Sequence, residues 1–225
     1  MSRPESQVSQ LDRDAVNRAV KSAEALTSAE IIPVIAASSG RYARSEDVVG
    51  LWTAVALLFA VWFMQPAQYD MVNSWDSPSP VWQFAINAVA VVVGFVAGAA
   101  ISSRVDVLRR LFTPARQMRD EVNLRARSVF FDRRVHHTAG ASGVLLYVSR
   151  FERMATVLAD ESVLETLGQQ QIDELCNEFT QRLRTSPPTV ALCETIQIIG
   201  QRLSPVMPRS EGDVNELADT LVVLP

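Results

Sequence analysis

The stretch Val81–Ile101, VWQFAINAVAVVVGFVAGAAI, contains no charged residue and lies inside a longer uncharged segment from Ser77 to Ser103. A helix rises about 1.5 Å per residue, so this stretch would form a helix roughly 31 Å long. The hydrocarbon core of a bilayer is about 30 Å thick. The stretch therefore has the length and composition of a membrane-spanning helix.

A second uncharged run, Val48–Met64, reads VVGLWTAVALLFAVWFM. It would span roughly 25 Å as a helix, the short limit for a membrane crossing. Aromatic residues are enriched at membrane surfaces, and three tryptophans lie near the ends of the two runs: Trp52, Trp62 and Trp82. With the polar loop 65–80 between them, the runs 48–64 and 81–101 predict a transmembrane hairpin over residues 48–102. Two buried helices of a soluble protein are the alternative.

The distribution of arginine predicts how this hairpin is oriented. The loop 65–80 contains two aspartates but no Lys or Arg. Arg41 and Arg44 precede the first run, and five arginines follow the second: Arg104, Arg109, Arg110, Arg116 and Arg119. By the positive-inside rule, both termini are expected in the cytoplasm and the loop outside the cell (inner) membrane. The first three of the five arginines are expected at the membrane interface, in contact with lipid.

Small residues recur along one face of the second run. Ala90, Gly94 and Gly98 are spaced by four residues and form a ridge that allows a neighbouring helix to approach closely. Asn87 lies near the same ridge and could donate a hydrogen bond across it. The ridge predicts a helix-packing seam, either within the hairpin or between two copies of the chain.

The segment that follows the hairpin is basic. Residues 103–134 contain nine arginines and four acidic residues, a net charge of +5. Thr113-Pro114 predicts a break into two helices, because a proline disfavours helical geometry in the residue before it. We expect this segment to contact anionic lipid headgroups. The whole chain has a net charge of −4, and the segment lacks interleaved aromatic residues, so a nucleic-acid partner is not expected.

Both flanks of the hairpin carry the pattern of a water-facing domain. Predicted strands cover Ala29–Ser39, Ser142–Ser149, Met154–Ala159 and Thr220–Leu224, and predicted amphipathic helices cover 11–27, Gln169–Arg184 and Val190–Leu203. Pro33 predicts an edge position or a bulge for the first strand. We expect an α/β fold with a small sheet of about four strands, built from residues 11–47 and 135–225 after a polar tail of residues 1–10. The transmembrane hairpin interrupts this domain as an insertion.

The order of these segments resembles the TPM domain family, which is named for a thylakoid lumen protein, a photosystem II repair protein and a levamisole-receptor modulator. The resemblance is carried by AEIIPVIAASSGRY (Ala29–Tyr42), the hairpin, GASGVLLYVSRFERMATVLAD (Gly140–Asp160), a helix and GDVNEL (Gly212–Leu217). It covers Leu11–Tyr42 and Pro114–Pro225 and is strongest to the bacterial membrane-protein branch. It implies helices on both faces of the sheet. It also implies two activities found among members: acid phosphatase activity with calcium binding, or an accessory role in membrane complexes.

This chain departs from the family pattern at two places. Many relatives have an Asn-Gly pair before the second strand, whereas this chain has Ser142-Gly143. Relatives also tend to continue the third strand into a glycine-rich stretch, and here residues 159–163 read ADESV.

Acidic residues after the third strand and before the last strand are the candidates for binding a metal: Asp160, Glu161, Asp213, Asn215 and Glu216. Calcium and magnesium bind carboxylate, amide and backbone oxygens. A cation site would form if the two acidic loops converged at one edge of the sheet, and a phosphatase could use that cation to polarise phosphoryl oxygen. A solvated acidic surface, with Asp213 as a helix N-cap, is the alternative.

The remaining chemistry-bearing residues have structural interpretations. Cys176 and Cys193 fall within apolar helical patterns and predict buried thiols, with a disulfide between neighbouring helices as the alternative. His136 and His137 are adjacent, and adjacent side chains on a helix point about 100° apart. That spacing is poor for chelating one metal and favours a solvated pair at a helix end.

Two functions follow from these observations. The first is a non-enzymatic accessory or assembly protein of a membrane complex, which binds lipid and also a protein partner or a second copy of itself. The second is a divalent-cation-dependent phosphatase of the TPM family, with calcium or magnesium as its cofactor. A channel or transporter component would need ionisable residues within the membrane runs, and the sequence has none there.

Overall fold

The computed structural model describes residues 8–40, 42–64, 80–138, 140–209 and 215–225. The chain divides into two compact units. One consists of Met1–Gly40 and Arg116–Pro225, and the other of Arg41–Ala115. The basic segment predicted over residues 103–134 is thus divided between the two units.

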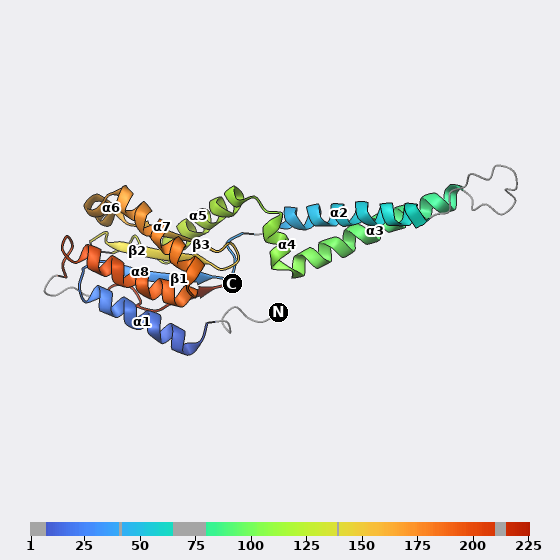
Figure 1. Ribbon diagram of the computed structural model, residues 1–225. Coiled ribbons are helices and arrows are strands. Elements are labelled where there is room, and N and C mark those ends of the chain that lie inside the picture. Colours follow the sequence, from blue (N-terminus) through green and yellow to red (C-terminus); the bar gives the residue numbers. More distant parts are fainter. Residues whose placement is uncertain (1–7, 41, 65–79, 139, 210–214) are drawn as a thin grey trace, which may run out of the picture. The chain divides into compact units, whose positions relative to one another are not determined.

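The first unit contains a four-stranded mixed sheet with the strand order β3-β2-β1-β4 (Figure 1). β1 (Glu30–Ala36) pairs in parallel with β2 (Gly143–Ser149) and β4 (Val222–Leu224), and β3 (Met154–Ala159) runs antiparallel to β2. Each strand lies within the segment predicted for it. The predicted α/β class, with a sheet of about four strands, is confirmed.

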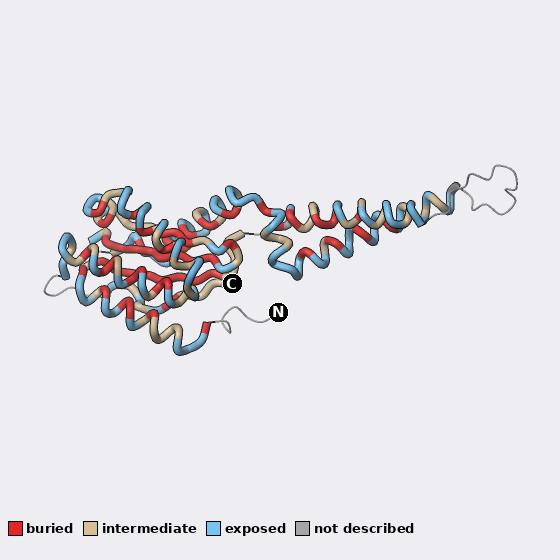
Figure 2. Tube along the Cα trace, viewed as in Figure 1, coloured by how far each residue is buried: buried red, intermediate tan, exposed pale blue. Residues whose placement is uncertain are grey.

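Helices cover both faces of the sheet. Successive side chains of a strand point to opposite faces, and the apolar side chains on each face pack against helices. One face packs against α1 (Gln10–Glu24), α6 (Glu161–Leu167), α7 (Gln169–Thr185) and α8 (Pro188–Leu203). The other face packs against α5 (Ala115–Asp132). Every residue of β1 and β2 is consequently buried (Figure 2). Burial on both faces explains why these strands read as continuous apolar runs.

Pro33 does not lie at a sheet edge or in a bulge as predicted, because β1 is an interior strand. The sheet tolerates the proline because β4 is short and pairs with β1 only at Val34–Ala36. The Ala37 N–H donates to the Leu224 carbonyl, on the β4 side. N–H groups alternate sides along a strand, so an N–H at position 33 would also point to the β4 side. Pro33 precedes Val34, the first residue of β1 that pairs with β4, so the N–H that proline lacks is not needed there.

The helices of this unit follow the predicted periodicity, except that the sequence pattern does not predict α6. α1 begins at Gln10, where the Ser9 side chain accepts a hydrogen bond from the Asp12 N–H. The sequence predicts that Asp160 and Glu161 lie in a loop after the third strand. Instead, Asp160 caps the N-terminus of α6 by accepting a hydrogen bond from the Glu161 N–H.

The two cysteines are free and half-buried. Cys176 lies on α7 and Cys193 on α8. The alternative of a disulfide between them is therefore wrong. The thiols were predicted to be buried, and each is only partly buried. Burial raises the pKa of both thiols.

The second unit contains α2 (Ala43–Met64), α3 (Pro80–Arg104) and the short helix α4 (Asp106–Leu111). α2 and α3 pack antiparallel, with Gly50 against Phe95 and Ala54 against Gly94. Both are long and apolar enough to cross a membrane, with mean hydropathies of 1.9 and 2.3. Only 17% of the most apolar part of each helix is buried, whereas the core helix of a soluble protein would be mostly buried.

Candidate functional site

A pocket of about 480 Å³ lies between the polar face of α1 and the segment that precedes β4. Asn17 and Lys21 line it from α1, and Asn215, Asp219 and Thr220 line it from the other segment. The Leu221 N–H donates a 2.9 Å hydrogen bond to the Asn17 side-chain oxygen. α1 therefore holds the chain in place where it enters β4.

Three carboxyl groups and one amide gather beside this pocket, and we call Glu24, Glu30, Asn215 and Asp219 the carboxyl cluster. Glu24, at the end of α1, accepts a 3.0 Å hydrogen bond from the Ile31 N–H. Glu30 is buried and accepts hydrogen bonds of 3.3 and 3.4 Å from the N–H groups of residues 216 and 217. The Asn215 amide donates to Asp219, whose carboxyl group also shares a hydrogen bond with Glu24.

The pKa of Glu24 is raised from 4.5 to about 8, mainly because burial removes water from its charged form. The neighbouring charges of Asp219 and Glu30 raise it further, while the hydrogen bond from Ile31 lowers it. A pKa of about 8 means that Glu24 is mostly protonated at pH 7. A carboxyl group that titrates near neutral pH can serve as a general acid or base.

Glu24→Gln is expected to flatten the dependence of stability on pH. The folded-state pKa of Glu24 lies above its ordinary value of 4.5, so the folded state binds a proton that the unfolded state has lost. Wild-type stability should therefore fall as the pH rises from 4.5 to about 8, and level off above that. We compare the free energy of unfolding of the variant with that of the wild type. Because Glu24 is partly exposed, we expect this difference to shift in favour of the variant by roughly 1–2 kcal/mol between pH 5 and pH 9.

Chemical denaturation at pH 5, 7 and 9 measures this difference. Glu165→Gln, on the exposed surface of α6, is the matched control and should follow the wild type. Parallel pH curves for Glu24→Gln and the wild type would show that Glu24 is not protonated in the fold.

The structure does not bring together the two acidic groups predicted to form a cation site. Asp160 and Glu161 follow β3, and the Asp160 N–H donates to the Gly143 carbonyl of β2. Asn215 and Glu216 lie next to the start of β1, and β2 separates β1 from β3 in the sheet. Asp213 lies outside the described residues.

Among the residues that the structure describes, no group of three or more His, Cys, Asp and Glu side chains is arranged to hold a metal ion. His136 and His137 are exposed just beyond the end of α5. The His136 ring packs against Phe131, with ring centroids 5.0 Å apart. The histidines thus form a solvated pair at a helix end.

The sequence prediction included Asn215 but missed Glu24, Glu30 and Asp219. One signal was available, because Asn17, Lys21 and Glu24 are spaced by four and three residues and share one helix face. Their partners were not predictable from spacing. Asn17 and Leu221 are 204 positions apart and meet only because β4 joins the sheet beside β1.

Within the hairpin unit, the seam of Ala90, Gly94 and Gly98 faces α2, so the partner across the seam is the hairpin's own first helix. A Cβ atom on Gly94 would lie 2.7 Å from the Ala54 Cα, and one on Gly98 would lie 3.0 Å from the Gly50 Cα. Large apolar side chains of both helices are exposed instead, among them Leu51, Phe59, Phe63, Phe84, Val89, Val92 and Val96.

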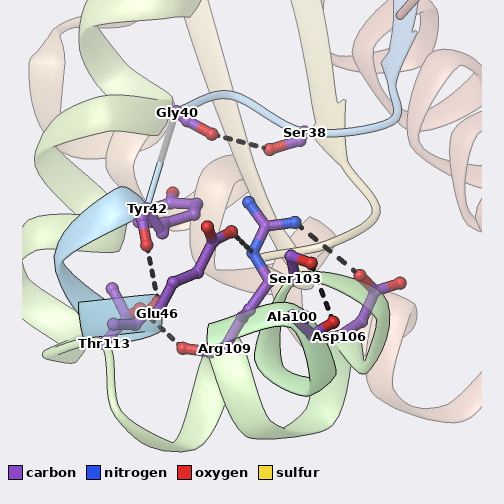
Figure 3. A network of polar contacts seen from close by, with 10 residues as sticks. Ser38, Gly40, Tyr42, Glu46, Ala100, Ser103, Asp106, Arg109 and Thr113 are labelled. Atoms are coloured by element: carbon purple, nitrogen blue, oxygen red, sulfur yellow. Dashed lines mark hydrogen bonds and ion pairs between the residues drawn. The ribbon is translucent and has the colours of Figure 1, made fainter. Parts of the chain in front are cut away.

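One end of the hairpin is held by charged residues (Figure 3). Arg109 of α4 forms an ion pair with Glu46 of α2, with 3.4 Å between Nε and Oε1, and lies 3.9 Å from Asp106. Arg109, predicted to contact lipid, is therefore half-buried and paired within the protein. Arg104 is exposed and Arg110 is half-buried.

The tryptophans predicted at the interface are all exposed. Trp62 and Trp82 lie near the end of α2 and the start of α3, which is the opposite end of the hairpin from Arg109. Trp52 lies ten residues before Trp62 in α2, about 15 Å away along the helix axis. It is farther from the helix end than predicted because α2 begins at Ala43 instead of Val48.

Comparison with known proteins supports the fold. No family model and no curated protein sequence matches the chain. The NMR structure of the BA42 protein from the psychrophilic bacteria Bizionia argentinensis sp. nov. is similar, with a TM-score of 0.57 and 16% sequence identity over 99% of each chain. At this identity, the similarity is one of fold alone.

Proposed function

We propose that the chain is an integral membrane protein in which α2 and α3 cross the bilayer as a hairpin. The observation that carries this proposal is the direction of the side chains: small residues line the seam between the helices, and large apolar residues point outward. Exposing apolar surface to water costs about 25 cal/mol per Å², and lipid removes that cost. Arg44 and Arg104 lie at one end of the hairpin, and the loop at the other end contains no Lys or Arg, which favours cytoplasmic termini.

The α/β unit is a cytoplasmic TPM-like domain that acts as a non-enzymatic accessory or assembly module of a membrane complex. The ordered segments of the sequence support this assignment. A four-stranded sheet with helices on both faces is also the architecture that the family resemblance implies. Because the hairpin's own helix occupies the small-residue seam, the partner contacts the outer faces of the hairpin or the α/β unit.

An activity assay tests the non-enzymatic role. The purified full-length protein in nanodiscs should hydrolyse no phosphomonoester in the presence of calcium or magnesium. In-cell cross-linking followed by purification through the hairpin-containing chain should recover a membrane partner or a cross-linked second copy. Metal-dependent turnover that Asp219→Asn abolishes would contradict the accessory role.

A divalent-cation-dependent phosphatase is the second candidate, and the carboxyl cluster favours it. Glu30, Asn215 and Asp219 supply carboxylate and amide oxygens, the ligand type that calcium and magnesium take. A cation held there would polarise a phosphoryl oxygen and activate water. The pocket beside the cluster gives a phosphomonoester a place to bind.

Calcium or magnesium is expected to raise the melting temperature of the full-length protein if this second function is correct. A ligand that binds only the folded state stabilises it by about 2.7 kcal/mol at 100 times its Kd. Asp219→Asn should remove the shift, and Asp173→Asn on the exposed face of α7 should keep it. If neither calcium nor magnesium changes the melting temperature of the wild type, the accessory role is the better account.

A further inference from the structure

The outward face of α5 carries apolar side chains that the fold does not use. Val122, Ala126 and Val129 of this helix are buried against the sheet. Leu124 and Phe131 are 64% and 61% exposed. They are seven residues apart, so at about 100° per residue they lie on one face, two turns apart and opposite the buried side. The His136 ring extends this face, with its centroid 5.0 Å from that of Phe131.

The segment that carries this face is basic overall, and Arg127 and Asp120 both lie on the face with Leu124 and Phe131. Residues 115–134 contain six arginines and three acidic residues, and all six arginines are exposed: Arg116, Arg119, Arg125, Arg127, Arg133 and Arg134. The rest of the unit is acidic, since residues 150–225 contain six arginines and twelve acidic residues. Residues 115–134 therefore carry a net charge of +3, with four of the six arginines on α5 and two directly after it.

We propose that this face of α5 docks the α/β unit onto anionic lipid at the cytoplasmic membrane surface. The proposal rests on the proposed membrane insertion of α2 and α3. Apolar residues flanked by arginine are what an interfacial helix presents to headgroups and acyl chains, and an anionic leaflet attracts such arginines. The chain leaves α3 at Arg104 and begins α5 at Ala115, so only ten residues lie between the two helices.

Nitroxide labels on the full-length chain in nanodiscs test this docking. Cys176 and Cys193 are first replaced with alanine, and one label is then placed at Leu124→Cys, at Val92→Cys on the lipid side of α3, or at Ser22→Cys on the exposed surface of α1. In phosphatidylcholine–phosphatidylglycerol nanodiscs, the label at 124 should become several-fold less accessible to a water-soluble nickel reagent and more accessible to oxygen. The label at 22 should stay in water.

The lipid charge dependence identifies the partner. Pure phosphatidylcholine should weaken docking, and so should 1 M salt, which shortens the Debye length to about 3 Å. Arg116→Gln and Arg127→Gln should each weaken it about fivefold. Protection of position 124 that is equal in both lipids, or that requires two chains per nanodisc, would assign the face to a protein contact and overturn the proposal.

A label at 124 that stays as accessible to nickel as the label at 22 also overturns the docking proposal. The label at Val92 separates this failure from failure of the membrane hairpin. If it reports lipid, only the docking of α5 is wrong. If it reports water, the hairpin does not span the bilayer, and the docking proposal fails with it.

Discussion

Replacing Gly94 with leucine will force α2 and α3 apart. A Cβ atom at this position would lie 2.7 Å from the Ala54 Cα and 3.1 Å from the Thr53 carbonyl oxygen. These are backbone atoms, so no side-chain rotation relieves the overlap. We expect the interaxial distance to increase toward the roughly 10 Å of helices that meet through larger side chains, with a loss of about 2–3 kcal/mol in hairpin stability.

Electron–electron distance measurement between nitroxide labels at Phe63 and Val81 measures the separation directly, since both positions are exposed. Ala97→Leu is the matched control, because Ala97 is exposed on α3. Equal distances in the Gly94→Leu and Ala97→Leu proteins would contradict the close packing of α2 against α3 at Gly94.

Gly143→Ala should destabilise the α/β unit severely, although it adds only one methyl group. The new Cβ would lie 2.0 Å from the Val135 carbonyl oxygen and 2.8 Å from its Cγ1. Gly143 also sits in the register of the sheet opposite Glu30, so β2 cannot shift without disturbing its pairing with β1. We expect a loss of about 3 kcal/mol or more.

Thermal unfolding followed by circular dichroism should show a melting temperature lower by roughly 6–12 °C for a unit of this size. Gly140→Ala is the control, because its nearest neighbour to a new Cβ is a flexible side-chain oxygen, Ser142 Oγ, at 3.4 Å. If the two variants melt together, the close approach of Val135 to β2 is wrong.

Much of the fold could be predicted because its signals are local. The strand at 154–159 was predicted with its observed bounds, and Pro114 separates α4 from α5 as expected. The prediction failed where a residue's environment depends on distant chain. Pro33 lies in an interior strand only because β4, nearly 190 positions later, pairs with just three of the seven residues of β1.

The candidate site was predictable to a smaller extent. The acidic residues before the last strand led to the prediction of Asn215 as a site residue. The raised pKa of Glu24 arises because the fold buries it beside Asp219, which no local pattern indicates. Asp160, a predicted candidate for metal binding, caps the N-terminus of α6. The short spacing of acidic residues fits both roles, and only the position of the following helix distinguishes them.

Cysteine labelling in intact cells tests the central claim, that α2 and α3 cross the membrane with both flanks in the cytoplasm. Cys176 and Cys193 are replaced with alanine, and single cysteines are introduced as Asn73→Cys in the connecting loop or as Gln170→Cys on the exposed surface of α7. A membrane-impermeant maleimide should modify position 73 in intact cells and position 170 only after the membrane is opened. Modification of position 170 in intact cells, or protection of position 73 until lysis, would contradict the account.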